Sequence, residues 1–326
     1  MPGWSTLFGP SGRLSRGAHL VREKGDRQVL GMAVVIMAAI IWGSTGVAGE
    51  YLLNTRGLDS AWLTTFRTSL GGILMLAVLA PRYKGALLDV WKDAHSVVRL
   101  AVFGLIGIAA NLYLYMLSVQ ASNAPTATTL QYLSPAFTVL WMALRNRRPP
   151  VLKEIVAVTC ALIGVVLVST KGNLDVLSIS AHGLAIGVLS AAALAFYGVY
   201  PKPLLATYGP LVTYAWGQLV GGVCMNMLRC PLWQFTPPSD GVIDIPLILV
   251  LGWQLVFGTV ISYAAYLVGV DMIGPSRASM LSSVEPGATA VLAAMLLSTP
   301  LVTTDYEGIA LMTACVVILS LPSAEA

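Results

Sequence analysis

Residues 124–144 read APTATTLQYLSPAFTVLWMAL, a run of 21 residues that contains no charged side chain. A helix needs about 20 consecutive apolar residues to cross the hydrocarbon core of a bilayer. Nine further runs of about 18 to 25 residues have the same character. They cover residues 29–53, 61–80, 97–118, 151–170, 181–200, 211–228, 246–270, 274–297 and 302–321. We therefore predict ten transmembrane helices joined by short loops.

The composition agrees with a chain whose solvent is lipid. Of the 326 residues, 56% are hydrophobic and 10% are charged, and the mean hydropathy is +0.78. Soluble domains have about 25% charged residues, and a soluble fold of this composition would expose large apolar patches. The fold class that we predict is an all-α integral membrane protein.

The 19 basic residues are divided unequally between the two sides of the predicted bundle. Fifteen lie in the N-terminal segment or in the alternate loops that share its side, three lie on the other side, and Arg67 lies within a run. Cytoplasmic loops carry the excess of lysine and arginine, so we expect both termini in the cytoplasm. The net charge of +4 then reflects orientation and not a surface for nucleic acid.

The apolar runs divide the chain into four segments. Residues 1–27 are predicted to be a mobile cytoplasmic tail and not a cleaved signal peptide, because the first apolar run is long and starts late. Residues 28–172 form a first five-helix repeat, residues 173–322 form a second, and residues 323–326 are the cytoplasmic C-terminus.

The two halves repeat each other at a spacing of about 151 residues. LLNTRG at 52–57 matches LLATYG at 204–209, Ser134-Pro135 matches Glu285-Pro286, and Tyr115 matches Tyr266. Five is an odd number of spans, so the second half is expected upside down relative to the first. Inverted repeats are typical of secondary transporters, whose solute site lies near the bilayer midplane between the halves.

Four stretches of the sequence resemble the drug/metabolite transporter superfamily, in its EamA-type branch. They read AAIIWGSTGVAGEYLL at 38–53, TTFRTSLGGILML at 64–76, NAPTATTLQYLSPAFTVL at 123–140 and GPSRASMLSSVEPGATAVLAAML at 274–296. The resemblance covers nearly the whole chain from about residue 30. It implies a ten-helix transporter built from two five-helix repeats.

The chain departs from the pattern of that family in two places. The Gly-Glu that often follows the fourth and ninth helices is replaced at residues 145–147 and 298–300, and Glu50 stands where a basic residue is common. These departures bear on the transported solute more than on the fold.

Glu285 is the strongest candidate for transport chemistry. It falls near the middle of an apolar run, where a charged group costs about 2.5–3.5 kcal/mol on insertion scales. Pro286 follows it and Pro135 occupies the matching place in the first half. Because proline removes a helical hydrogen bond, we expect both helices to bend there as gates. The structural alternative is a carboxyl satisfied by the hydroxyls of Ser282 and Ser283.

Three other charged residues are candidates for the solute or ion pathway. Arg67 could bind a substrate carboxylate, although a role in helix packing is the favoured alternative. Glu50 and Lys202 occupy equivalent positions in the two halves. If the halves are inverted, Glu50 and Lys202 would lie at opposite ends of one pathway and act as charged gates there. The alternative is that both are ordinary charges at the membrane interface.

Polar and aromatic residues within the apolar runs are predicted to line a cavity for the solute. An aromatic ring with a hydrogen-bonding tip suits amphipathic organic solutes. The alternative is helix packing through small and polar residues, which is also expected at Gly71-Gly72 and Gly221-Gly222. The predicted lining consists of Trp42, Asn111, Tyr115, Gln131, Ser134, Tyr197 and Tyr266.

Several functional motifs do not occur in the sequence. The four cysteines form no CxxC pair, the three histidines do not cluster, and no GxxxxGK[ST] loop is found. We therefore predict no metal site, no cofactor and no enzyme activity. A phosphorylated substrate would require several basic residues in the membrane interior, and only Arg67 and Lys202 are candidates for such positions.

Together these features predict a secondary transporter in the plasma membrane of a prokaryote. It would export a small organic solute, such as an amino acid, a metabolite or an amphipathic drug, by alternating access, with protons as a candidate partner. The alternatives are a passive facilitator, a non-transporting receptor or assembly protein and, least favoured, a membrane-embedded enzyme. The oligomeric state stays open.

Overall fold

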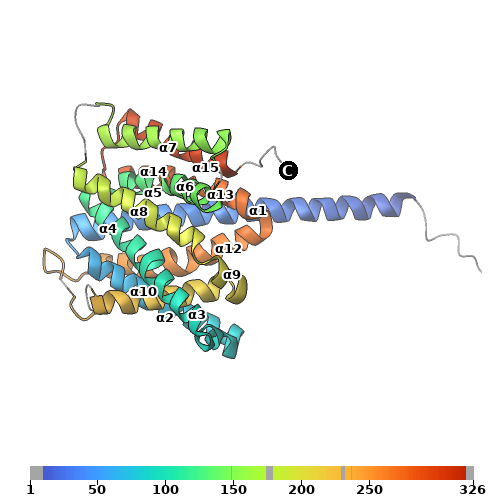
Figure 1. Ribbon diagram of the computed structural model, residues 1–326, viewed down its shortest axis with the longest axis horizontal. Helices are drawn as coiled ribbons and strands as arrows, with labels where there is room; N and C mark the ends of the chain where they lie inside the picture. The colour runs from blue at the N-terminus through green and yellow to red at the C-terminus, as the bar shows by residue number, and fades with distance from the viewer. Residues whose placement is uncertain (1–9, 148, 174–178, 229–231, 236, 321–326) are drawn as a thin grey trace, which may run out of the picture.

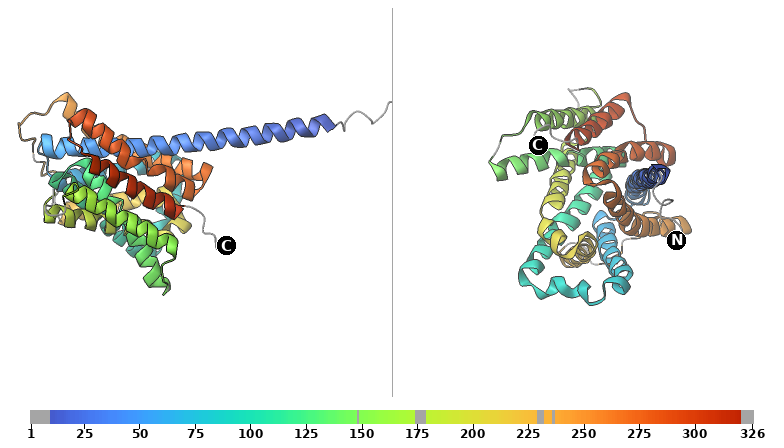
Figure 2. Two further views of the ribbon diagram at one scale, coloured as in Figure 1. Left: turned by 90° about the horizontal axis from the view of Figure 1, so that it is seen from above. Right: turned by 90° about the vertical axis from the view of Figure 1, so that its right-hand side faces the viewer.

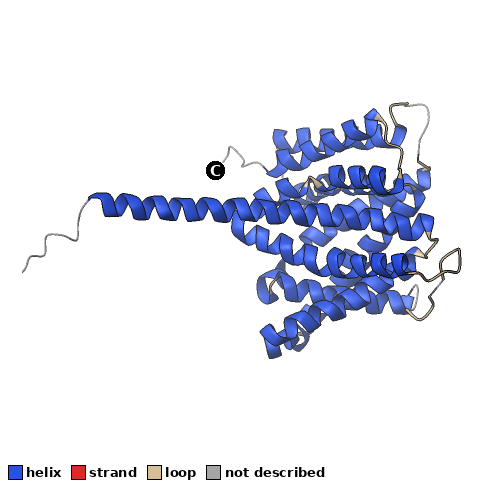
Figure 3. Cartoon of the chain, turned by 180° about the vertical axis from the view of Figure 1, so that it is seen from behind, coloured by secondary structure: helices blue, strands red, loops and turns tan. Residues whose placement is uncertain are grey.

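The computed structural model describes residues 10–147, 149–173, 179–228, 232–235 and 237–320. Every element of regular secondary structure in these residues is a helix (Figure 3). The helices lie side by side in a bundle, and most of their axes run roughly in the direction of the long helix α1 (Figure 1). The expected all-α fold is confirmed for the described residues.

The first half contains seven α-helices and three segments with other helical geometry. A π-helical turn, η1, continues α1, the 3-10 segment η2 follows α2, and the π-helical segment η3 joins α3 to α4. The bounds are α1 Pro10–Glu50, η1 Tyr51–Thr55, α2 Ser60–Tyr83, η2 Lys84–Lys92, α3 Ala94–Val102, η3 Phe103–Ala110, α4 Asn111–Ala121, α5 Ala124–Gln131, α6 Ser134–Asn146 and α7 Leu152–Thr170.

The described second half has a similar order of elements, with α9 in the place of η1 and no counterpart of η2. A π-helical segment, η4, again joins two helices in its middle. The bounds are α8 Ala181–Val199, α9 Lys202–Tyr208, α10 Pro210–Leu228, α11 Ile245–Leu255, η4 Val256–Ile261, α12 Ser262–Ile273, α13 Pro275–Ser282, α14 Glu285–Leu297 and α15 Thr303–Ser320.

Helix starts in the two halves correspond at a spacing of 151 residues. Helices α3 and α11 are both preceded by an aspartate, Asp93 or Asp244, whose carboxylate accepts hydrogen bonds from backbone amides of the first turn. Such a side chain satisfies amides that have no partner within the helix. The starts of α5 and α13, and those of α6 and α14, are also 151 residues apart. The repeat seen in the sequence is therefore a repeat of structure.

Contacts between the helices follow an approximate two-fold symmetry. Four extensive contacts between α-helices join α2 to α10, α7 to α15, α1 to α12 and α4 to α8. The first two pairs each join equivalent helices of the two halves, and the last two pairs are equivalent to each other. The halves therefore interlock around a shared centre and do not form two separate lobes.

Glycines allow the backbones of α2 and α10 to approach closely. A Cβ on Gly72 would lie 2.5 Å from the backbone nitrogen of Leu219, and one on Gly222 would lie 2.6 Å from Cα of Ser69. Small residues at helix crossings are typical of membrane bundles, where van der Waals packing replaces the hydrophobic effect. The predicted packing role of these two glycine pairs is confirmed.

Seven helices in the described residues are long and apolar enough to cross a membrane. They are Gln28–Thr55, Ser60–Lys92, Ala94–Ala121, Leu152–Thr170, Ala181–Val199, Ile245–Ile273 and Arg277–Leu297. The other three expected spans correspond to α5 with α6, to α10 and to α15. The expected span over 124–144 consists of α5, which ends at Gln131, and α6, which begins at Ser134.

Helix α1 extends far beyond the bundle at its N-terminal end (Figures 1 and 2). Residues 10–27 are helical in the structure, whereas residues 1–9 and the C-terminal residues 323–326 lie outside the described part of the chain. The cytoplasmic placement and mobility expected for residues 1–27, and the boundary between the repeats at residues 172 and 173, stay predictions.

Candidate functional site

Both halves interrupt a helix just before a proline. The first interruption lies between α5 and α6 and the second between α13 and α14, and Pro135 and Pro286 each occupy the first turn of the helix that follows. The sequence predicts a bend at each proline inside a continuous helix. Proline is favoured in a first turn, where its missing N–H has no partner to lose, so the break falls upstream of each ring.

Glu285 is the first residue of α14, and its carboxylate interacts with the opposite half. The hydroxyl of Tyr132 donates to Oε2 of Glu285 at 3.1 Å and lies 2.9 Å from the carbonyl oxygen of Ser282. Tyr132 is itself in the interruption between α5 and α6. The two interruptions are therefore connected by a hydrogen bond between the halves.

A cluster of aromatic rings occupies the region between α1, α8, α10 and α12. Trp42 lies 5.0 Å from Tyr263 and 5.2 Å from Tyr266, measured between ring centroids. Tyr263 is stacked on Tyr214 at 4.0 Å, and Tyr214 contacts Tyr197 edge to face at 6.4 Å. We call these five residues the aromatic cluster.

Arg67 of α2 is buried at the edge of the aromatic cluster, with 8% of its surface exposed. Its Nε has no hydrogen-bond partner in the part of the chain that the structure describes. The phenol groups of Tyr214, Tyr263 and Tyr115 lie within electrostatic range of its guanidinium group. Its Nε is therefore a buried donor whose burial is not offset by a hydrogen bond within the described residues.

Tyr263 connects the two charged residues of the site. Its phenol lies within electrostatic range of both Arg67 and Glu285. Arg67 comes from the first half and Glu285 from the second, so the two residues belong to opposite halves of the bundle.

Polar side chains from three elements meet next to the interruption of the first half. Nε2 of Gln131 donates to Oδ1 of Asn111 at 3.1 Å and to the hydroxyl of Ser190 at 3.0 Å. Ser134, at the start of α6, occupies the position equivalent to Glu285 and is partly buried. The structure thus brings Asn111 and Gln131 together, as a packing network or as a lining.

Tyr115 and Glu50 form contacts on α1 and α5. The hydroxyl of Tyr115 lies 2.9 Å from the hydroxyl of Thr128. Oε2 of Glu50 accepts a hydrogen bond of 2.8 Å from the backbone amide of Ala124, and Oε1 lies 3.5 Å from the hydroxyl of Thr299. Glu50 therefore joins the end of α1 to the start of α5 and to the residues that follow α14.

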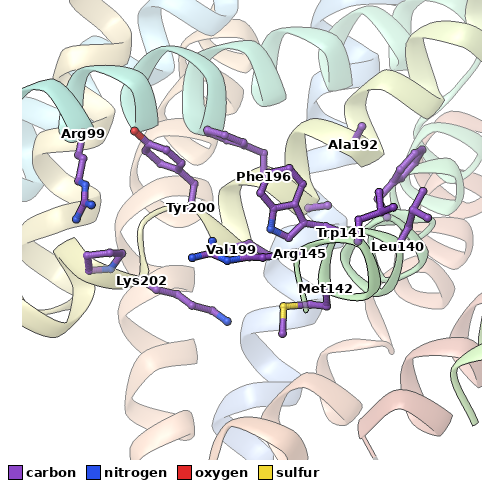
Figure 4. A pocket seen from close by; sticks show the side chains of 14 residues that line it. Arg99, Leu140, Trp141, Met142, Arg145, Ala192, Phe196, Val199, Tyr200 and Lys202 are labelled. Atoms are coloured by element: carbon purple, nitrogen blue, oxygen red, sulfur yellow. The ribbon is translucent and has the colours of Figure 1, made fainter. Parts of the chain in front are cut away.

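Lys202 differs from its counterpart Glu50. It is exposed at the start of α9 and lines a cavity between α6 and α8 (Figure 4). It is therefore separate from the aromatic cluster, to which the structure assigns Trp42, Tyr197 and Tyr266.

Three residues of the central region were not predicted from the sequence to belong to the site. Tyr132, Tyr214 and Tyr263 lie within predicted spans, where tyrosine resembles any other large apolar residue. The usable signal was the position of Tyr132, two residues before the Ser134-Pro135 that matches Glu285-Pro286.

This arrangement can bind a small solute by charge and by ring contact. The described residues contain no group of three histidine, cysteine, aspartate or glutamate side chains placed to hold a metal. The fold and its centre define a class of protein, namely a helical membrane bundle of two repeats with aromatic and charged residues at their junction.

Known proteins narrow this class to one family. The sequence pattern of the EamA-like transporter family matches residues 29–170 and again residues 181–321. The chain belongs to this family and is an integral membrane transporter.

Similar proteins come from distant organisms. The uncharacterized inner membrane transporter YicL of Salmonella typhimurium is 33% identical over 293 residues, which cover 90% of this chain and 96% of that protein. An uncharacterized transporter of Archaeoglobus fulgidus is 24% identical over 84% of this chain and 93% of its own length. A crystal structure of a protein with 16% sequence identity superimposes with a TM-score of 0.59 over 89% of this chain and 95% of that one, which indicates a shared fold.

Proposed function

We propose that this protein is a secondary transporter that exports a small organic solute by alternating access. The observation that carries the proposal is an asymmetry between two equivalent ends of the bundle. At one end α5 packs against α14. At the other end the equivalent helices, α6 and α13, are not among the pairs in substantial contact within the described chain.

The side chains at the two ends show the same asymmetry. At the packed end Glu50 is buried and holds the start of α5 through the amide of Ala124. At the other end its counterpart Lys202 is exposed. Exchange of these two arrangements between the halves would close one end and open the other, which is what alternating access requires of inverted repeats.

The proposed topology has ten spans in two inverted five-helix repeats. Helices α5 with α6, α10 and α15 would supply the three spans beyond the seven recognised by length and apolarity. The distribution of basic residues supports cytoplasmic termini, and the inner-membrane relative supports the plasma membrane of a prokaryote. The packed end would then face outward and the open end inward.

The proposed solute carries opposite charges on a small organic body, as an amino acid does. Arg67 would hold an anionic group, since its guanidinium can bind a carboxylate with two hydrogen bonds. Glu285 would face a cationic group or a proton, and the rings of Trp42 and Tyr266 would contact the apolar part. Other metabolites and amphipathic drugs with this charge pattern are included in the proposal.

Glu285 is also the proposed site of proton coupling. A partly buried carboxyl between two interrupted helices is suited to exchange a proton when the cavity changes sides. Pro135 and Pro286, each in the first turn after an interruption, would keep these breaks free to flex.

The test is solute flux in liposomes that contain a pH-sensitive dye. A panel of amino acids and amphipathic amines is added to reconstituted wild type and to Glu285→Gln. Coupled transport predicts a solute-triggered pH change that Glu285→Gln loses while it stays folded. Solute movement without proton movement would establish the passive facilitator, and no movement of any compound would favour a receptor or assembly protein.

A further inference from the structure

A cavity lies apart from the aromatic cluster, between α6 and α8, near the C-terminal ends of both helices. Its volume is about 650 Å³, within the range of about 300–1,000 Å³ that is typical of ligand sites. Apolar side chains form most of its wall, and Leu140 and Trp141 are also exposed on the outside of the bundle. The cavity is therefore open to the lipid beside the protein.

Three cations surround one end of this cavity. Arg99 of α3, Arg145 of α6 and Lys202 of α9 all line it, and its lining contains no aspartate or glutamate. Figure 4 shows these three side chains toward one end, whereas Leu140, Trp141 and Ala192 lie toward the other. None of the three cations forms a salt bridge with a described residue.

The aromatic residues mark the boundary between these two ends. Phe196 and Tyr200 stack at 4.5 Å between ring centroids and both line the cavity. Tyrosine and tryptophan are enriched at the level of the lipid headgroups, where one end of the ring is apolar and the other is polar. The cavity thus combines an apolar wall, an aromatic boundary and a cationic end in the order of the parts of a phospholipid.

We propose that the cavity between α6 and α8 binds an anionic phospholipid through Arg99, Arg145 and Lys202. The anionic headgroup meets the three cations, and the acyl chains lie along Leu140, Trp141 and Phe196. Basic pockets between transmembrane helices bind anionic headgroups in this way. Lipid binding at this site does not require transport activity, so this proposal can be tested independently of the proposed function.

The test measures which lipid lies next to Trp141. The full chain is reconstituted in brominated phosphatidylcholine with increasing fractions of unbrominated phosphatidylglycerol. The Trp141 signal is the fluorescence of wild type minus that of Trp141→Phe, because the chain has eight tryptophans. Preferred binding of phosphatidylglycerol relieves the quenching at a lower mole fraction than random mixing predicts.

The wild type is expected to prefer phosphatidylglycerol by at least about fivefold, because one basic residue at a membrane surface contributes about that factor. The combined variant Arg99→Gln, Arg145→Gln and Lys202→Gln is expected to lose the preference. If it does not reconstitute, Arg145→Gln alone, at an exposed position, should lose part of it.

Arg147→Gln is the matched control, because Arg147 is exposed next to this helix end but does not line the cavity. It should retain the wild-type preference. Equal affinity of wild type for the two lipids, or an equal loss in Arg147→Gln and in the combined variant, would overturn the proposal.

Discussion

Tyr132 and Glu285 lie at the helix interruptions of opposite halves and share a hydrogen bond of 3.1 Å. The equivalent of Glu285 in the first half is Ser134, which has no carboxylate and so cannot form the equivalent hydrogen bond. The bond therefore breaks the symmetry of the two repeats at their centre. It joins the acid of one half to the helix break of the other.

Replacement of Tyr132 by phenylalanine tests this relationship. The change removes the donor near both Glu285 and the carbonyl oxygen of Ser282. A buried acceptor left without a partner costs about 1–3 kcal/mol, so Tyr132→Phe should lower the midpoint of thermal unfolding in detergent. It should also reduce solute flux, since Glu285 loses its partner. Tyr266→Phe is the control, because the hydrogen bonds described in the structure include none from that hydroxyl. An equal loss of stability in both variants would show that the bond contributes nothing particular.

Glu50→Ala should open the packed end of the bundle. The change removes the acceptor for the amide of Ala124. Loss of a hydrogen bond to a charged group shifts the equilibrium between the closed and open forms of this end about tenfold or more toward the open form. A cysteine placed at Thr299, which is buried, should then react about tenfold faster with a membrane-impermeant maleimide.

Glu50→Gln provides the control for this experiment, because its amide oxygen can still accept from Ala124. Labelling of Thr299→Cys should be slower in Glu50→Gln than in Glu50→Ala. Equal labelling with glutamate and alanine at position 50 would show that this contact does not hold the end closed.

Gly72→Ala should destabilise the contact between α2 and α10. The added Cβ would lie 2.5 Å from a backbone nitrogen, which cannot move without shifting α10. Overpacking of this kind costs about 1–3 kcal/mol, measurable as a lower unfolding midpoint.

Gly198→Ala makes the same chemical change in α8 at a position where the new Cβ meets nothing within 4 Å. Alanine is the better helix former by about 1 kcal/mol, so this variant should be neutral or more stable. A loss of stability in Gly198→Ala as large as that in Gly72→Ala would contradict the packing argument.

The ion pair of Arg56 and Asp244 should make stability depend on acid pH. Nη1 of Arg56 lies 2.9 Å from Oδ2 of Asp244, and this hydrogen bond lowers the pKa of the Asp244 carboxyl below its usual value. A lowered pKa in the folded state means that the contribution is present above the unfolded pKa of about 3.9 and is lost as the pH falls through the folded value.

Asp244→Asn isolates this charge, because asparagine can still cap α11 through the amide of Leu247. The unfolding midpoint of wild type should exceed that of Asp244→Asn at pH 7, and the difference should shrink below about pH 4. A difference that stays constant down to pH 3 would show that the charge is not the source.

The sequence alone determined the class of fold, because hydrophobic run length is dictated by bilayer thickness and can be read locally. It also determined the repeat, since matching residues such as Tyr115 and Tyr266 keep a constant spacing. Glu285 stood out for a similarly local reason, as a charge inside an apolar run has few explanations.

Only the tertiary structure decided which residues meet. Tyr214 and Tyr263 gave no signal in the sequence, because a tyrosine in a membrane helix can face lipid, a neighbour or the centre. Tyr132 was marked only by its position before Ser134-Pro135. The break before each proline and the different environments of Glu50 and Lys202 were also not readable. These features depend on contacts between segments more than 70 residues apart, such as that of Glu50 with Ala124. Hydropathy acts on each segment by itself, whereas a site forms where several segments come together.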